Sequence, residues 1–190
     1  MLLSSCGDAA RQPAKPVTMT DQRLIAGLRA CGIDPADATQ ANELENGKRV
    51  GYLVFGVDPP YPAPKMRCLA ALLLRAHYAV RQSGEPFESA YRDAWNAEFP
   101  IFTRELALAW LREHRPGESP PQFMPGDAPR DFAQVLEKFC GAGPGSMTVE
   151  RRTFLIADTE DVSRIDCLFH AGLGANLERQ GFSVHAPSYE

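Results

Sequence analysis

Cys167 and His170 come closest to a catalytic arrangement in this 190-residue chain. They lie three positions apart on a predicted helix, so a thiolate and an imidazole could approach each other. A cysteine nucleophile also needs a base that activates it and donors that stabilise an oxyanion, and no neighbouring residue supplies either. The pair therefore does not predict a hydrolase.

Two further stretches contain residue types that bind phosphate or metal. The glycine-rich stretch 141–146 lacks the lysine of a phosphate-binding loop, and it follows a helix and precedes a strand, which is the wrong order for such a loop. The acidic residues within 158–161 begin a predicted helix, where negative charge is stabilising without a metal. We therefore expect no catalytic residue, no metal and no cofactor, and the sequence favours a binding protein over an enzyme.

The composition is that of an ordinary globular protein, with 44% hydrophobic and 23% charged residues. The net charge is −4 and there is no long basic run, so we do not expect nucleic acid as a partner. No stretch reaches the roughly 18 to 20 apolar residues that span a bilayer. The predicted fold is α+β and helix-rich, with several helices packed around a small antiparallel sheet of two or three strands in a single globular domain over residues 19–190.

The fold prediction starts from residues 49–82. An apolar, β-rich run over 50–57 predicts a buried strand, and apolar residues at helical spacing over 66–82 predict a buried helix. We expect a second strand over 147–157 to pair with the first, and a short third strand at 182–184. The other predicted helices cover residues 21–30, 34–45, 86–99, 103–114, 131–140 and about 158–173. Pro100 should separate two of them into a helical hairpin.

The first residues, MLLSSC, end in a cysteine that follows an aliphatic and two small residues. Leu3-Ser4-Ser5-Cys6 resembles the lipobox of bacterial lipoproteins, in which the cysteine is lipidated. Residues 1–6 would then be the remnant of a signal peptide whose basic and apolar parts are missing, and the polar, Pro- and Ala-rich residues 7–18 a flexible tether. The resemblance implies lipidation at Cys6 and a periplasmic location, with Gly7 favouring the outer membrane. The alternative is a disordered tail with an incidental cysteine.

Four cysteines remain besides Cys6, an even number that allows three pairings. We expect Cys31 to pair with Cys68, and Cys140 with Cys167, because each pair lies in neighbouring elements of the chain. The alternative is four buried thiols that act as small hydrophobic side chains.

Three residues are candidates for contact with a protein partner. Phe123 and Met124 lie in the middle of the long irregular segment 115–130, which prolines stiffen, so this apolar pair could enter a partner's cleft at low entropic cost. The alternative is that Phe123 folds back onto the surface of its own domain. Tyr61, in the proline-rich turn before the buried helix, is the third candidate.

An aromatic ridge recurs at steps of four in the predicted helix 86–99. Its members are Phe87, Tyr91, Trp95 and Phe99. Such a ridge indicates either a core face or, since aromatic side chains dominate binding hot spots, an exposed recognition stripe.

The organisation of the chain resembles that of periplasmic immunity lipoproteins, which neutralise toxins that one bacterium delivers into another. No motif of a specific family is matched. The resemblance implies a secreted effector enzyme, encoded by a neighbouring gene, as the protein partner, and membrane contact through the lipid anchor only. Two alternatives are an envelope assembly or secretion-accessory lipoprotein, and a cytosolic α+β protein of regulatory or weak enzymatic function.

Overall fold

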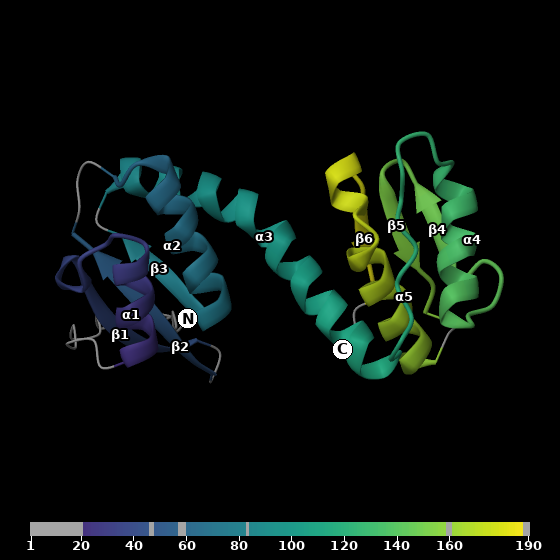
Figure 1. Ribbon diagram of the computed structural model, residues 1–190, viewed down its shortest axis with the longest axis horizontal. Coiled ribbons are helices and arrows are strands. Elements are labelled where there is room, and N and C mark those ends of the chain that lie inside the picture. Colours follow the sequence, from purple (N-terminus) through teal and green to yellow (C-terminus); the bar gives the residue numbers. More distant parts are fainter. Residues whose placement is uncertain (1–20, 46–47, 57–59, 83, 159–160, 188–190) are drawn as a thin grey trace, which may run out of the picture. The chain divides into compact units, whose positions relative to one another are not determined.

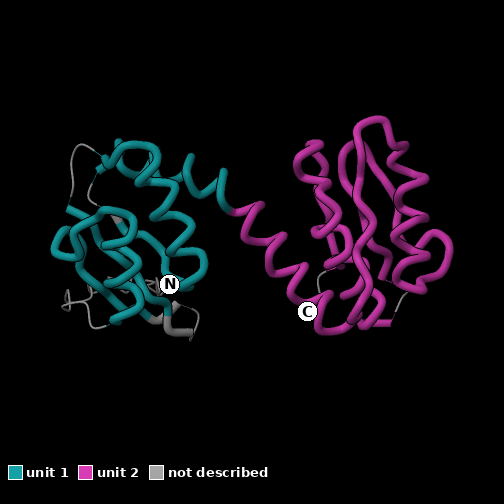
Figure 2. Tube along the Cα trace, in the orientation of Figure 1, with its two compact units in different colours: residues 1–98 teal, residues 99–190 magenta. Residues whose placement is uncertain are grey.

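The computed structural model describes residues 21–45, 48–56, 60–82, 84–158 and 161–187 (Figure 1). The chain divides into two compact units, residues 1–98 and 99–190 (Figure 2). Each unit has its own hydrophobic core. The chain is α+β and helix-rich as predicted, but two units replace the one domain expected over residues 19–190. The lipobox-like Cys6 and the tether 7–18 lie outside the described residues.

Unit 1 is a three-stranded mixed sheet with helices packed against it. Its elements are α1 (Gln22–Ala30), the short 3-10 helix η1 (Pro35–Asp37), β1 (Ala38–Glu45), β2 (Lys48–Phe55), α2 (Ala63–Ala76), β3 (Tyr78–Gln82) and the first part of α3 (Glu85–His114). In the order β1-β2-β3, β1 is antiparallel to β2 and β3 is parallel to it. A parallel neighbour requires a crossover connection, which α2 provides. Leu53 and Phe55 of β2 are fully buried against α1 and α2.

Unit 2 is built in the same way from the second half of the chain. Its elements are the rest of α3, α4 (Pro129–Cys140), β4 (Met147–Glu150), β5 (Thr153–Ile156), α5 (Val162–Gly174), the short 3-10 helix η2 (Leu177–Gln180) and β6 (Ser183–His185). In the order β4-β5-β6, β4 is antiparallel to β5 and β6 is parallel to it. Phe154 of β5, Leu136 of α4 and Leu168 of α5 are fully buried in its core.

Both units therefore follow one order of elements: a helix, a β-hairpin, a second helix and a parallel strand. In each unit, a cysteine at the end of the first helix is followed directly by a glycine with positive φ. A proline comes three positions after that glycine. These residues are Cys31, Gly32 and Pro35 in unit 1, and Cys140, Gly141 and Pro144 in unit 2. The hairpin begins seven positions after the cysteine in each unit, at Ala38 and at Met147. Unit 2 repeats the fold of unit 1 with a shorter hairpin.

The backbone hydrogen bonds that follow each cysteine match in the two units. Gly32 and Gly141 donate to the carbonyls of Arg29 and Lys138, and Ile33 and Ala142 donate to those of Leu28 and Glu137. Such bonds satisfy carbonyls that the end of a helix leaves without partners. The site favours glycine, because the backbone there has a φ of 70° in unit 1 and 65° in unit 2, which is strained for residues with a side chain.

The two disulfides occupy the same place in both units. Cys31 at the end of α1 is bonded to Cys68 of α2, and Cys140 at the end of α4 is bonded to Cys167 of α5. The Cα separations are 5.5 Å and 5.6 Å. The predicted pairing is confirmed, and the alternative of four free thiols is wrong. Because disulfides form and persist in oxidising compartments, these bonds indicate a secreted-type, non-cytosolic protein.

The predicted strand 50–57 is confirmed as β2, but the predicted helix 34–45 is wrong. Asp34 does cap a helical turn and accepts a hydrogen bond from the Ala36 amide at 2.9 Å. That turn ends at Asp37, and residues 38–45 form β1, which pairs with β2 along its whole length. Strand pairing outweighs the local helix preference of this polar stretch.

The predicted strand 147–157 does not pair with β2. It folds back at Arg151, whose φ is 55°, and forms the β4–β5 hairpin of a second sheet. The predicted antiparallel sheet is thus two mixed sheets, and the third strand expected at 182–184 is β6 of the second. The buried helix predicted over 66–82 ends at Ala76, because His77 adopts a left-handed conformation with φ 55° and the following residues form β3.

The helical hairpin predicted around Pro100 is also wrong, because α3 continues through this residue. A proline removes one backbone donor, but its fixed φ is compatible with a helix. The Thr103 hydroxyl lies 3.0 Å from the Phe99 carbonyl and 3.1 Å from the Pro100 carbonyl. Among the described residues, no helix is long and apolar enough to span a membrane.

Candidate partner-binding pocket

The structure separates the two residues predicted at the tip of segment 115–130. Phe123 is buried, with 5% of its surface exposed, and its ring contacts those of Phe132, Phe154 and Phe182 at centroid distances of 5.0 to 6.3 Å. Its amide donates to the Ala175 carbonyl at 2.9 Å. Phe123 therefore folds back into unit 2, as the alternative interpretation of this segment held, and is not available to enter a partner's cleft.

Met124 remains on the surface, with 58% of its area exposed. Its amide donates to the Asp127 carboxylate at 2.7 Å, which holds the turn that follows Phe123. One exposed methionine beside a buried phenylalanine presents a much smaller apolar surface than the predicted pair.

Tyr61 is half-buried beside the core of unit 1. Its ring makes edge contacts with Phe55 and Phe87, and its hydroxyl donates to the Asp37 carboxylate at 2.9 Å. Burial, together with the bond to Asp37, raises the pKa of Tyr61 well above its ordinary value. Tyr61 also lines a hollow of about 300 Å³ between α2 and α3, so the core does not enclose it completely.

The aromatic ridge of α3 divides between core and surface. Phe87 is 2% exposed and stacks on Phe55 at 5.3 Å, whereas Phe99 is 37% exposed. Tyr91 and Trp95 are partly buried between these extremes and line a pocket. Phe87 of the ridge is thus a core residue, whereas Tyr91, Trp95 and Phe99 are at least partly accessible, as a recognition stripe requires.

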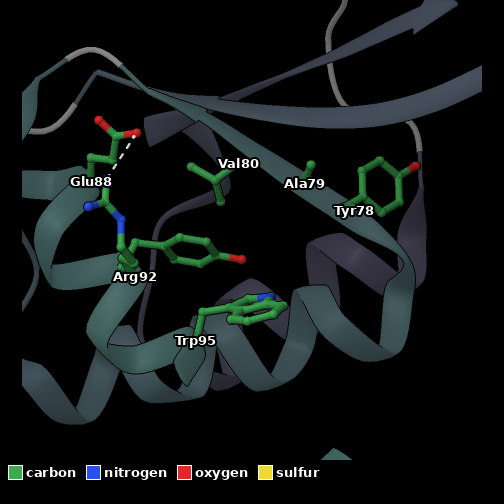
Figure 3. A pocket seen from close by; sticks show the side chains of 7 residues that line it. Tyr78, Ala79, Val80, Glu88, Arg92 and Trp95 are labelled. Carbon is green, nitrogen blue, oxygen red and sulfur yellow. Dashed lines mark ion pairs between the residues drawn. The ribbon is translucent and has the colours of Figure 1, made fainter. Parts of the chain in front are cut away.

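This pocket, of about 370 Å³, lies between strand β3 and helix α3 in unit 1 and is called the β3–α3 pocket (Figure 3). Its lining residues are Tyr78, Ala79, Val80, Glu88, Tyr91, Arg92 and Trp95. The α3 residues are spaced so that they lie on one face of the helix over successive turns. Three aromatic residues, two small apolar residues and one charged pair thus surround a hollow that opens to solvent.

The pocket lies beside the terminal strand of the sheet. Tyr78, Ala79 and Val80 are consecutive residues of β3, and consecutive strand side chains point to opposite faces. Tyr78 and Val80 therefore share one face of β3, the face that packs against the unit 1 core, and Ala79 lies between them. In the order β1-β2-β3, β3 is a terminal strand, so its outer edge has no partner strand among the described strands.

Tyr78 is held at one end of the pocket by its neighbours in the sheet. Its ring lies against Gly51 of β2, where an added Cβ would come within 2.6 Å of the ring, so a glycine is required there. The buried amide of Gln40 donates to the Tyr78 hydroxyl at 2.8 Å. Desolvation, and next the negative charge of Asp21, raise the pKa of Tyr78, so the phenol stays neutral.

Tyr91 is positioned by a stack of rings that extends outward from the core. Phe55 stacks on Phe87, and Phe87 stacks on Tyr91 with a centroid distance of 6.5 Å and an interplanar angle of 11°. Burial raises the pKa of Tyr91 to about 12. Ring stacking alone is enough to hold Tyr91 at the pocket wall, and this does not require a hydrogen bond to its hydroxyl.

The charges around the pocket are predominantly negative. Glu88 and Arg92 form an ion pair at 3.6 Å, with both side chains at least half exposed. Glu85 lies one turn before Glu88 on the same helix face, and Asp21 is close enough to Tyr78 to raise its pKa. The basic residue next to the pocket on β3, Arg81, is paired with Glu43 and lies 5.0 Å over the Tyr52 ring.

The Cys167–His170 pair considered for catalysis forms no such arrangement. Cys167 is bonded to Cys140, and His170 stacks on Trp110 at 4.3 Å while its Nδ1 lies 2.7 Å from the Asp166 carbonyl. Asp161 caps α5, and chiefly the Ser163 hydroxyl lowers the pKa of its carboxyl. Within the described residues, no group of three or more histidine, cysteine or acidic side chains is placed to hold a metal.

The sequence matches no protein-family model and no curated protein, and the fold matches no solved structure. The candidate site therefore depends on the geometry of this chain alone.

Sequence patterns predict one side of the β3–α3 pocket only in part and miss the other. The spacing of Tyr91 and Trp95 predicts either a core face or an exposed recognition stripe, and both residues line the pocket. Residues 78–80 are predicted as the end of a helix, because apolar residues at helical spacing continue through them and outweigh the strand preference of Tyr78 and Val80.

Proposed function

We propose that this protein is an envelope immunity protein that binds and inhibits a secreted antibacterial effector enzyme. The β3–α3 pocket is the observation that carries the proposal. It combines two partly exposed aromatic residues, Tyr91 and Trp95, with a strand edge that has no partner among the described strands, and these are features that protein partners use. The proposed contact surface is therefore this pocket and not the 115–130 segment, whose Phe123 is buried.

The two disulfides support the compartment that this function requires. Each connects two helices of one unit, α1 with α2 or α4 with α5, and such bonds are rare in the cytosol, where glutathione keeps thiols reduced. An effector delivered into the periplasm would meet its inhibitor there. Anchoring through a lipid on Cys6 would keep the inhibitor at the membrane, and the outer membrane is the proposed location.

Co-purification with the product of the neighbouring gene tests the proposal. Full-length protein should form a complex with that product, and its co-expression should restore growth to cells that carry the effector in the periplasm. The matched control is a cytosolic version without residues 1–6, which should bind after oxidation but should not protect. If the neighbouring product is not toxic and forms no complex, the immunity function is wrong.

Lipidation is tested separately. Mass spectrometry of the native protein should find acyl chains on Cys6, and Cys6→Ser should release the protein from membranes while leaving its affinity for the effector unchanged. An unmodified Cys6 in membrane-free fractions would contradict the anchor without affecting the binding proposal.

A further inference from the structure

The β3–α3 pocket lies beside a strand edge that has no partner among the described strands, and this geometry restricts what can bind there. Tyr78 and Val80 line the pocket from one face of β3. An extended segment paired with the outer edge of β3 would continue the sheet and direct alternate side chains to that same face, toward α3. A compact side chain or a helix could fill the hollow but would make no backbone pairing with β3.

The wall opposite β3 is suited to a positively charged side chain. Trp95 and Tyr91 both line the hollow, and the faces of aromatic rings attract cations. Of the acidic residues in the first part of α3, Glu88 lines the pocket, whereas Asp93 lines the hollow between α2 and α3 and Glu98 is paired with Arg67. Glu85 and Glu88 are on the face toward the pocket, and Asp21 adds negative charge near its other end.

Arg92 is the one basic lining residue, and it does not block a cation. Its pair with Glu88 is 3.6 Å long, and the two side chains are 66% and 50% exposed. Exposed pairs on a helix contribute at most about 1 kcal/mol, so an incoming cation can replace Arg92 beside Glu88 at little cost. Arg81 is engaged with Glu43 on the sheet.

We infer that the partner presents an extended basic segment that adds to β3 as a fourth strand and places an arginine or lysine side chain between Trp95 and Glu88. This inference depends on the proposed function only for the partner's identity as an effector. The strand addition supplies affinity through the backbone, and the pocket supplies specificity for the basic side chain.

A peptide titration of the full-length protein tests the inference. The chain has two tryptophans, so Trp110→Phe leaves Trp95 in the pocket as the sole tryptophan, whose fluorescence can be excited selectively over that of the tyrosines. The probe is a short blocked peptide of alternating valine and arginine, and its control replaces each arginine with glutamate. Saturable change of Trp95 fluorescence is expected with the arginine peptide and none with the glutamate peptide. Equal binding of both peptides, or of neither, would overturn the basic-segment inference.

Backbone methylation of the peptide distinguishes strand addition from simple charge attraction. Alternate residues of an added strand point their amides toward and away from β3. Methylating the amides of one alternate set should abolish binding, whereas methylating the other set should leave it intact. If the two methylated peptides bind equally well, the segment does not add as a strand.

Variants locate the binding to this pocket. With a dye-labelled peptide, Trp95→Leu should weaken binding by about twofold to thirtyfold, the range of a lost cation–π contact, and Glu88→Gln by about twofold to fivefold. Glu113→Gln, on the last turns of the same helix but in unit 2, is the matched control and should change nothing. An unchanged affinity in both pocket variants would place the binding elsewhere and overturn the inference.

The two proposals fail in different ways. If the effector co-purifies but the arginine peptide does not bind, the strand-addition inference is wrong and the immunity function stands. If the peptide binds with the expected selectivity but no effector is found, the pocket assignment stands and the immunity function is wrong.

Discussion

Removing one disulfide should destabilise one unit and not the other. The sequence separations are 37 residues for Cys31–Cys68 and 27 residues for Cys140–Cys167. In the chain-entropy model these loops correspond to about 3.8 and about 3.6 kcal/mol of stabilisation at 25 °C. For a unit of this size, a loss of that amount lowers the melting temperature by about 15 °C or more. The effect is large because each bridge closes a long loop of the unfolded chain and so lowers its conformational entropy.

The two tryptophans make the units separately observable, since Trp95 lies in unit 1 and Trp110 in unit 2. In the Trp110→Phe background, Cys31→Ala with Cys68→Ala should lower the free energy of unfolding that Trp95 reports. In the Trp95→Phe background, the same pair of substitutions should leave the Trp110 transition in place. Replacing Cys140 and Cys167 should give the reciprocal result.

Two results would contradict this reasoning. Equal destabilisation at both tryptophans would mean that the units do not unfold separately, in spite of their separate cores. A loss below about 1 kcal/mol at the matching tryptophan would mean that the bridge does not restrict the unfolded chain as the model requires. The control is the unsubstituted protein treated with a phosphine reductant, which breaks both disulfides. Its loss of stability at each tryptophan should equal that of the matching double variant.

Three further predictions follow from side-chain environments. Phe123→Ala should destabilise unit 2 by about 3 to 5 kcal/mol in denaturant unfolding, because it empties a packed aromatic site, whereas Met124→Ala should stay within about 0.5 kcal/mol. The pKa of Tyr91 is about 12 in the folded protein against 10.0 ordinarily, so the unfolded chain loses its proton first, and stability should fall as the pH rises from about 10 through about 12. Tyr91→Phe should remove that part of the fall, and an unchanged pH profile would contradict the burial effect. Glu137→Ala should cost about 1 to 3 kcal/mol, because the buried carboxylate accepts the Met147 amide at 2.8 Å, and Glu137→Gln should lose less in the same assay.

Repetition of the fold was hidden in the sequence for a physical reason. The units share the spacing of cysteine, glycine and proline after the first helix, but the positions between them differ. Their hairpins also differ in length, with strands of eight residues in unit 1 and four in unit 2. A common backbone needs only similar burial at equivalent positions. Leu28 of unit 1 and Glu137 of unit 2 are such equivalents: both are buried, and the carbonyl of each accepts the same backbone hydrogen bond at the end of its helix.

Residues 34–45 show where local patterns fail. This stretch has a capping residue and a proline at a first helical position, and both features do form a short helical turn. Its polar side chains give no strand signal, and the stretch becomes β1 only because β2 lies beside it. Pro100 shows the converse, since a residue that usually ends a helix is accommodated inside α3.

The sequence by itself determined the elements whose signals are local: the buried strand β2, the amphipathic helices α2, α4 and α5, and the irregular segment after His114. The structure decided the cysteine pairing among the three that the sequence allows. Apolar periodicity and helix caps act within a few residues, so they can be recognised without a partner. Only the tertiary structure decided that there are two sheets, that Phe123 points inward and that Tyr78 and Trp95 share a pocket. These outcomes depend on contacts between distant residues, whose free energies appear only when the chain has folded.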